Sequence, residues 1–83
     1  MQLTVEISMY PFVEDYKTLI KDFIDELNKR DGLIINTTPT ATMVHGEYNH
    51  VFETLKELMA WSYDIRGRAV FVSKFIPGPD LAD

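Results

Sequence analysis

The chain contains no cysteine, so neither a disulfide bond nor a cysteine-based zinc site can stabilise it. It also lacks any run of about 20 apolar residues, which is the length that a membrane-spanning helix needs. The first six residues carry no basic charge and end at Glu6, whereas a signal peptide begins with a basic region. These absences predict a cytoplasmic protein with no membrane partner.

The chain also has no excess of basic residues. The net charge is −5, whereas nucleic acids and anionic membranes are bound by basic surfaces, so neither is expected as a partner. The acidic balance mildly favours a cationic ligand. All 83 residues fit a single domain, 1–83. A domain of this size buries only about 60% of its unfolded surface, so oligomerisation is an expected source of stability.

Two periodicities organise the chain. Residues 3–9 alternate between apolar and polar side chains and predict a strand, which Pro11 ends. Further strands are predicted at 33–37, 40–45 and 68–76. Apolar residues recur every three or four positions over 14–29 and 48–63 and predict two helices; Asn49 is the expected cap of the second helix. Met9, Met43 and Met59 are expected to fill the core.

The resulting order, β-α-β-β-α-β, predicts an α+β fold of the ferredoxin-like class. Right-handed crossovers place both helices on one face of a four-stranded antiparallel sheet with strand order 4-1-3-2. The other face of the sheet is then left open. Its predicted side chains come from three strands: Thr4, Glu6, Ser8 and Tyr10; Ile34 and Asn36; Thr40, Thr42 and Val44.

The two edge strands contain Leu33-Ile34-Ile35 and Val70-Phe71-Val72, which are apolar on both sides. A sheet with one solvated face should show a polar alternate set, so both faces are predicted to be covered. This pattern predicts a homo-oligomer, a dimer or tetramer joined through the sheet. The enclosed polar groups would either satisfy one another across the interface or line a ligand pocket. The candidate ligand-binding residues are Glu6, Ser8, Tyr10, Asn36 and Thr42.

Four short segments, in order, resemble the thiamine/hydroxymethylpyrimidine-binding family: Ser8-Met9-Tyr10-Pro11, Thr42-Met43-Val44-His45-Gly46, Asn49-His50-Val51-Phe52 and Gly78-Pro79-Asp80. The resemblance implies a small-molecule binder for thiamine or its hydroxymethylpyrimidine moiety, acting in thiamine salvage or transport. It also implies subunits that associate through their sheets, with Ser8, Tyr10 and Thr42 directed towards the ligand. The alternative is an oligomeric interaction or regulatory module without a small-molecule ligand.

No catalytic motif is visible: the chain has no phosphate-binding loop, nucleophile elbow or Ser–His–Asp set. His45 and His50 are five residues apart, and no cysteine supports them as ligands of a metal. A non-enzymatic protein without cofactor or metal is therefore expected.

Overall fold

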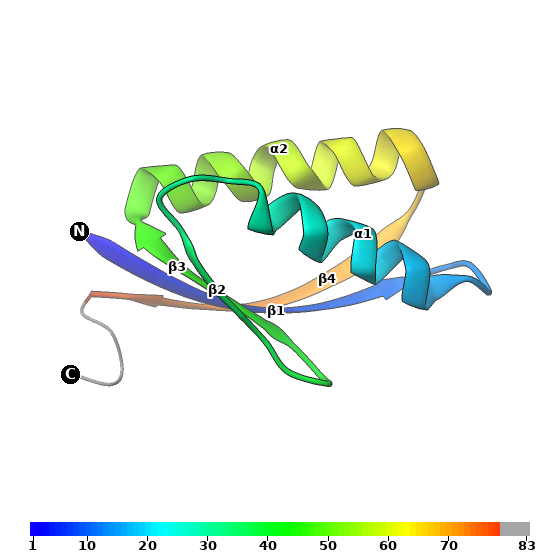
Figure 1. The fold of residues 1–83 in the computed structure, drawn as a ribbon, viewed down its shortest axis with the longest axis horizontal. Helices are drawn as coiled ribbons and strands as arrows, with labels where there is room; N and C mark the ends of the chain where they lie inside the picture. Colours follow the sequence, from blue (N-terminus) through cyan, green and yellow to red (C-terminus); the bar gives the residue numbers. More distant parts are fainter. Residues whose placement is uncertain (79–83) are drawn as a thin grey trace.

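The fold is described by a computed structural model for residues 1–78; Pro79 and Asp80, the end of the last segment that resembles the family, lie outside the described residues. The elements follow the predicted order (Figure 1). They are β1 (Gln2–Pro11), α1 (Tyr16–Asn28), β2 (Ile34–Thr37), β3 (Thr42–Glu47), α2 (Tyr48–Arg66) and β4 (Ala69–Pro77).

The four strands form one sheet in the order β2-β3-β1-β4, and every neighbouring pair is antiparallel. This is the predicted order read from the opposite edge. Both helices lie on the same side of the sheet, as Figure 1 shows, and the other side has no cover within the described chain. The ferredoxin-like α+β prediction is confirmed.

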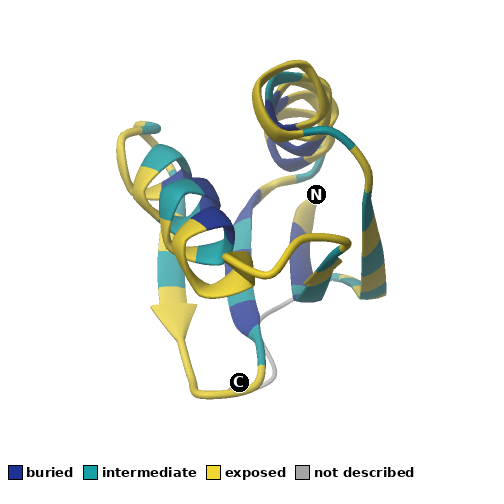
Figure 2. Ribbon diagram, turned by 90° about the vertical axis from the view of Figure 1, so that its right-hand side faces the viewer, coloured by how far each residue is buried: buried dark blue, intermediate teal, exposed yellow. Residues whose placement is uncertain are grey.

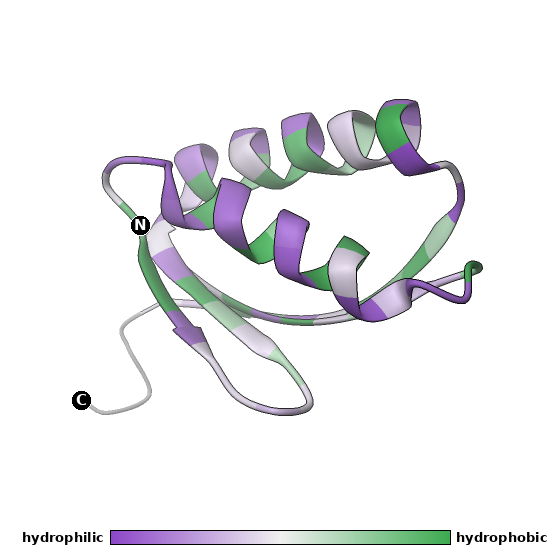
Figure 3. Ribbon diagram, turned by 45° about the vertical axis from the view of Figure 1, so that its right-hand side comes forward, coloured by the Kyte–Doolittle hydropathy of each residue, from purple (hydrophilic) through white to green (hydrophobic). Residues whose placement is uncertain are grey.

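The core lies between the sheet and the two helices, where Figure 2 shows buried segments of both layers facing each other. From β1 it takes the alternate residues Leu3, Val5 and Ile7, which follow the predicted period of two. From α1 it takes Phe23 and Leu27, four residues apart on one side of the helix. The apolar sides of both helices turn towards the sheet in Figure 3. The remaining members are Val44, Val51, Leu55 and Leu58.

The cap of α2 is Glu47, and the prediction of Asn49 was wrong. The Glu47 carboxylate accepts hydrogen bonds from the backbone N–H groups of Asn49 at 2.8 Å and His50 at 3.1 Å. These are two of the N–H groups that the first turn of a helix leaves unpaired. Gly67 ends α2 with a φ of 84°, a conformation that favours glycine.

The predicted face of β3 was also wrong. Val44 lies opposite Val5 and Thr42 lies opposite Ile7, so both point towards the helices instead of the open side. Gly46 suits this phase because its position on the helix side is tightly enclosed: a Cβ there would be 2.7 Å from Leu33 Cδ2, just before β2, and 3.4 Å from Val51 Cγ2 on α2. The odd-numbered residues of β3 consequently face the open side.

The uncovered face, called the open face below, therefore has a mixed surface. Within residues 1–78 it comprises Thr4, Glu6, Ser8 and Tyr10 of β1, Ile34 and Asn36 of β2, Met43 and His45 of β3, and Val70, Val72, Lys74 and Ile76 of β4. Met43 thus lies outside the core, contrary to the prediction. Met59 is also outside it, with 41% of its surface exposed.

Candidate functional site

The end of β1 extends beyond its neighbour β3. The β1–β3 ladder runs from the Gln2–Glu47 pair to the Ile7–Thr42 pair and stops there. β1 continues to Pro11, paired only with β4 on its other side. The last four residues of β1 therefore have one backbone edge that no strand of the described chain covers.

The hydrogen-bonding phase of β1 decides which groups lie on that free edge. Gly78 donates to the Gln2 carbonyl at 2.9 Å, and Phe12 donates to the Arg68 carbonyl at 3.4 Å. In an antiparallel pair, alternate residues direct their N–H and C=O to the same neighbouring strand, so the even-numbered residues of β1 face β4. The N–H and C=O of Met9 consequently point the other way, past the end of β3.

A crevice of about 380 Å³ lies along this free edge. Its walls come from the end of β1, the start of α1 and the turn between β2 and β3; its lining residues are Ser8, Met9, Tyr10, Pro11, Tyr16, Ile20, Pro39 and Thr40. A smaller cavity of about 80 Å³ adjoins it beneath α1 and shares five of these residues. The main volume lies within the range of roughly 300–1,000 Å³ typical of small-molecule sites.

The β2–β3 turn is held against the crevice by short hydrogen bonds. The Ser8 hydroxyl donates to the Thr40 carbonyl at 3.0 Å. Within the turn, the N–H of Thr38 donates to the Ala41 carbonyl at 2.8 Å, and the Thr38 hydroxyl accepts from the Ala41 N–H at 3.1 Å. Pro39 further restricts the turn because its ring fixes φ. The crevice is therefore bordered by an ordered turn.

The structure brings three of the five predicted ligand-binding residues to this region. Ser8 and Tyr10 line the crevice, and Thr42 lines the adjoining cavity from the helix side of the sheet. Glu6 and Asn36 lie elsewhere, on either side of Met43 on the open face. Glu6 is also 3.8 Å from the ammonium group of Lys74. The five residues therefore do not form one site.

Sequence reasoning missed the Met9 backbone, Tyr16, Ile20 and Pro39. Tyr16 is one of the apolar residues whose spacing over 14–29 predicts the first helix, but 46% of its surface is exposed. One signal was available: the alternation of β1 continues to Tyr10, whereas the proline of the next hairpin limits how far β3 can pair. Because β1 is longer than β3, the end of β1 keeps a free backbone edge.

No cluster of three or more His, Cys, Asp or Glu side chains suited to a metal ion occurs within residues 1–78. None of the helices in this part of the chain has the length and apolarity required to cross a membrane.

A four-stranded antiparallel sheet with two helices on one face, and a crevice where the first strand outruns its neighbour, defines a ferredoxin-like protein with a small-molecule-sized site. The model of the YKOF-related Family matches residues 2–64, and the chain belongs to that family. No curated protein matches the chain.

Solved structures share the fold over almost the whole chain. A protein of Streptococcus pneumoniae is 20% identical with a TM-score of 0.86, and the match covers 99% of this chain and 92% of that one. A candidate thiamine biosynthesis/salvage protein of Thermotoga maritima is 25% identical with a TM-score of 0.83, covering 94% and 85%. A domain of unknown function from Bacillus cereus is 18% identical with a TM-score of 0.75, covering 95% and 78%.

Proposed function

We propose that the chain is a non-catalytic binding protein for thiamine or for its hydroxymethylpyrimidine moiety, acting in thiamine salvage or transport, and that the crevice holds the pyrimidine ring. The Thermotoga maritima relative, a candidate thiamine biosynthesis/salvage protein, supports this assignment. Membership of the YKOF-related Family is consistent with it. The ligand itself is argued from the crevice.

The observation that carries the proposal is the free backbone edge of Met9. Its N–H and C=O point into the gap left where β3 ends, and so offer one donor beside one acceptor. An aminopyrimidine has the complementary edge, an amino donor beside a ring-nitrogen acceptor. The pyrimidine ring would therefore lie where a residue of β3 would be if that strand were longer, and it would pair with the backbone of Met9.

The walls of the crevice suit the rest of such a molecule. Tyr10 and Tyr16 supply aromatic rings, which can stack on a pyrimidine or hold a thiazolium cation by a cation–π contact of about 0.5–2 kcal/mol. The hydroxyls of Ser8 and Thr40 add polar groups to the lining. The chain's net charge of −5 favours the cation weakly.

A titration of the protein with the free pyrimidine, monitored through the backbone amide NMR signals, tests this pairing. The Met9 amide proton should shift downfield as 4-amino-5-hydroxymethyl-2-methylpyrimidine is added. The analogue without the amino group should bind about tenfold more weakly, because one hydrogen bond is lost. Ser8→Ala should weaken binding by loosening the turn, whereas Ser73→Ala, on β4 outside the crevice, should not. An unshifted Met9 amide, or equal affinity for both pyrimidines, would contradict the proposal.

Thermal unfolding gives an independent measurement. A ligand present at 100 times its Kd stabilises the folded state by about 2.7 kcal/mol. Thiamine, its phosphates and the free pyrimidine should be titrated separately, so that the preferred form is identified. If none of them raises the Tm of the wild-type chain, the thiamine assignment is wrong.

The open face favours a second role, in association. Its apolar residues are widely exposed, Ile34 at 60% and Val72 at 54%. Two pairs of its polar groups already contact each other: Thr4 is hydrogen-bonded to His45 at 2.7 Å, and the Glu6 carboxylate lies 3.8 Å from the Lys74 ammonium group. Each such contact lowers the cost of burying the surface, because the groups that it joins need fewer new partners when water is removed. We infer that a second copy covers this face, in a dimer or tetramer.

Sedimentation tests the association separately from ligand binding. Val72→Glu should shift the wild-type oligomer towards monomer, whereas Val13→Glu, which is also exposed but outside the sheet, should not. A wild-type chain that remains monomeric at its highest usable concentration would rule out the oligomer. If that oligomer forms but no thiamine-like compound binds, the interaction or regulatory module becomes the better description.

A further inference from the structure

A second concave surface lies on the helix side of the sheet, between α2 and β4, and is called the groove below. Its volume is about 370 Å³. Four of its lining residues come from α2 and three from β4, with two more at its base: Phe52, Leu55, Lys56, Met59, Phe71, Ser73, Phe75, Ile7 and Phe23. The groove shares no residue with the crevice at the end of β1.

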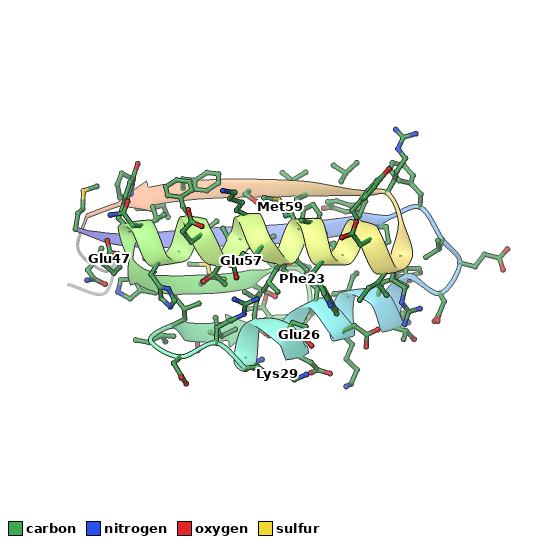
Figure 4. The ribbon with its side chains drawn as sticks, turned by 90° about the horizontal axis from the view of Figure 1, so that it is seen from above. Phe23, Glu26, Lys29, Glu47, Glu57 and Met59 are labelled. Carbon is green, nitrogen blue, oxygen red and sulfur yellow. The ribbon has the colours of Figure 1, made fainter. Side chains whose placement is uncertain are left out.

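The groove exists because the helices do not cover the whole sheet. α2 packs mainly over β3 and β1, while α1 packs over β1 and β2. Figure 4 shows β4 along the edge of the molecule beyond α2, with Met59 on the side of the helix towards that strand. The helix-side residues of β4 therefore extend past the core, and Phe75 keeps 49% of its surface exposed.

Aromatic rings form much of the wall. The ring of Phe52 stacks on that of Phe75, with centroids 5.5 Å apart and an interplanar angle of 11°. Tyr48 meets Phe52 edge to face at 4.9 Å, and the rings of Phe23 and Phe71 lie 5.3 Å apart. Such rings offer flat apolar surfaces on which another planar ring can stack or pack by its edge.

One charge accompanies these rings. Lys56 is the only charged residue that lines the groove, and the Ser73 hydroxyl is the only other polar side chain in it. Within residues 1–78 neither Lys56 nor Lys17 makes a salt bridge, whereas Lys21, Lys29 and Lys74 each pair with a carboxylate, and of the two unpaired lysines only Lys56 lines the groove. An ammonium group without a carboxylate partner beside an apolar surface favours a ligand with a single negative charge.

We propose that the groove binds a small planar aromatic compound carrying one carboxylate, with the ring among Phe52, Phe71 and Phe75 and the carboxylate at Lys56. This site is independent of the proposed thiamine function and lies on the opposite side of the sheet from the open face. A subunit covering the open face would leave the groove accessible.

Calorimetric titration with 2-naphthoate, and with neutral 2-naphthalenemethanol for comparison, tests the proposal. The carboxylate compound should bind saturably and shift the NMR signals of Phe75 and Met59. Lys56→Gln should weaken its binding about fivefold, the factor that corresponds to ~1 kcal/mol for a partly exposed ion pair. Lys56→Arg should largely restore it, because the positive charge is retained. Lys17→Gln, on α1, and Ser8→Ala, in the crevice, should leave naphthoate binding unchanged.

Three results of the titrations would each overturn the inference. These are no saturable binding of 2-naphthoate, equal affinity for the neutral alcohol, or an affinity unaffected by Lys56→Gln. A concentration-dependent shift of the Phe75 and Met59 signals without ligand would show that another copy of the chain occupies the groove, and would also overturn it. Failure here leaves the thiamine proposal intact, because the groove and the crevice share no lining residue and are tested with different compounds.

Discussion

The hydroxyl oxygen of Thr4 lies 2.7 Å from Nδ1 of His45, and this hydrogen bond joins β1 to β3 across the open face. Thr4 is buried although it belongs to the uncovered side of the sheet. Its two strand neighbours, His45 and Ile76, lie on either side of it and cover it. A polar contact shielded in this way holds the two central strands in register.

Replacement of Thr4 by valine should therefore destabilise the fold. The substitution keeps the side-chain shape but removes the hydrogen bond to His45, at a cost of about 1 kcal/mol. For a domain of this size the Tm should fall by about 4–8 °C. Thermal unfolding measures the change, with Thr18→Val as an exposed control of identical chemistry. Equal Tm values for the two variants would show that the bond contributes nothing.

Much of the fold could be predicted because its signals are local. The alternation of β1 and the helical spacing of Phe23 and Leu27 are set by residues close in sequence, and they fixed the element order and the class. The apolar edge strands were also visible, and Ile34 and Val72 are indeed exposed in the single chain.

The site was less predictable because it depends on how strands meet. The phase of β3 agrees with the close packing of Gly46 against Leu33 and Val51, which are distant in sequence, so the sequence of β3 alone does not indicate it. Thr42 was consequently placed on the wrong face. The crevice arises from the difference in length between β1 and β3, which only the register defines. The role of the Met9 backbone cannot be predicted from side-chain types, because its N–H and C=O are free only through the pairing of the strands.

Gly46→Ala should test the close packing around this position of β3. The added Cβ would be 2.7 Å from Leu33 Cδ2 and 3.1 Å from the Gly32 carbonyl oxygen. Overpacking of this kind costs about 1–3 kcal/mol. Chemical denaturation should show the loss as a lower midpoint with an unchanged m-value.

A double variant separates steric crowding from other effects of this alanine. Leu33→Ala removes the nearer of the two clashing groups, so Gly46→Ala should be less harmful in the Leu33→Ala background than in the wild type. The coupling between the two substitutions should be about 0.5–3 kcal/mol. Strictly additive costs would mean that the Leu33 contact is not what excludes a side chain at position 46.

Leu58 and Met59 are neighbours on α2, but Leu58 belongs to the core and Met59 lines the groove. Replacing each in turn compares how much the two regions contribute to stability. Leu58 is 1% exposed and Met59 is 41% exposed. Leu58→Ala should cost about 2–5 kcal/mol because it leaves a cavity, which is a large part of the roughly 5–15 kcal/mol that stabilises a typical domain. Met59→Ala should cost about 1 kcal/mol or less. Similar losses in denaturation would show that the groove side of α2 is covered in the folded protein.

Glu47 should make the stability of α2 depend on pH. Hydrogen bonds from the backbone N–H groups, that of Asn49 first and that of His50 as well, lower the pKa of the Glu47 carboxyl below its ordinary value. Since the folded-state pKa is the lower one, the carboxylate stabilises the fold fully above the ordinary Glu pKa of about 4.3. This stabilisation is lost as the pH falls from there through the folded-state pKa.

Glu47→Gln tests this dependence, because it removes the charge while keeping a side-chain oxygen that can accept a hydrogen bond. The Tm of the variant should lie below that of the wild type at neutral pH, and the difference should shrink as the pH is lowered through the carboxyl range. Glu53→Gln makes the same charge change on an exposed position of α2 without a capping contact, and its Tm difference should stay small throughout. A Glu47→Gln difference that is constant across the pH range would mean that the carboxylate charge has no part in capping the helix.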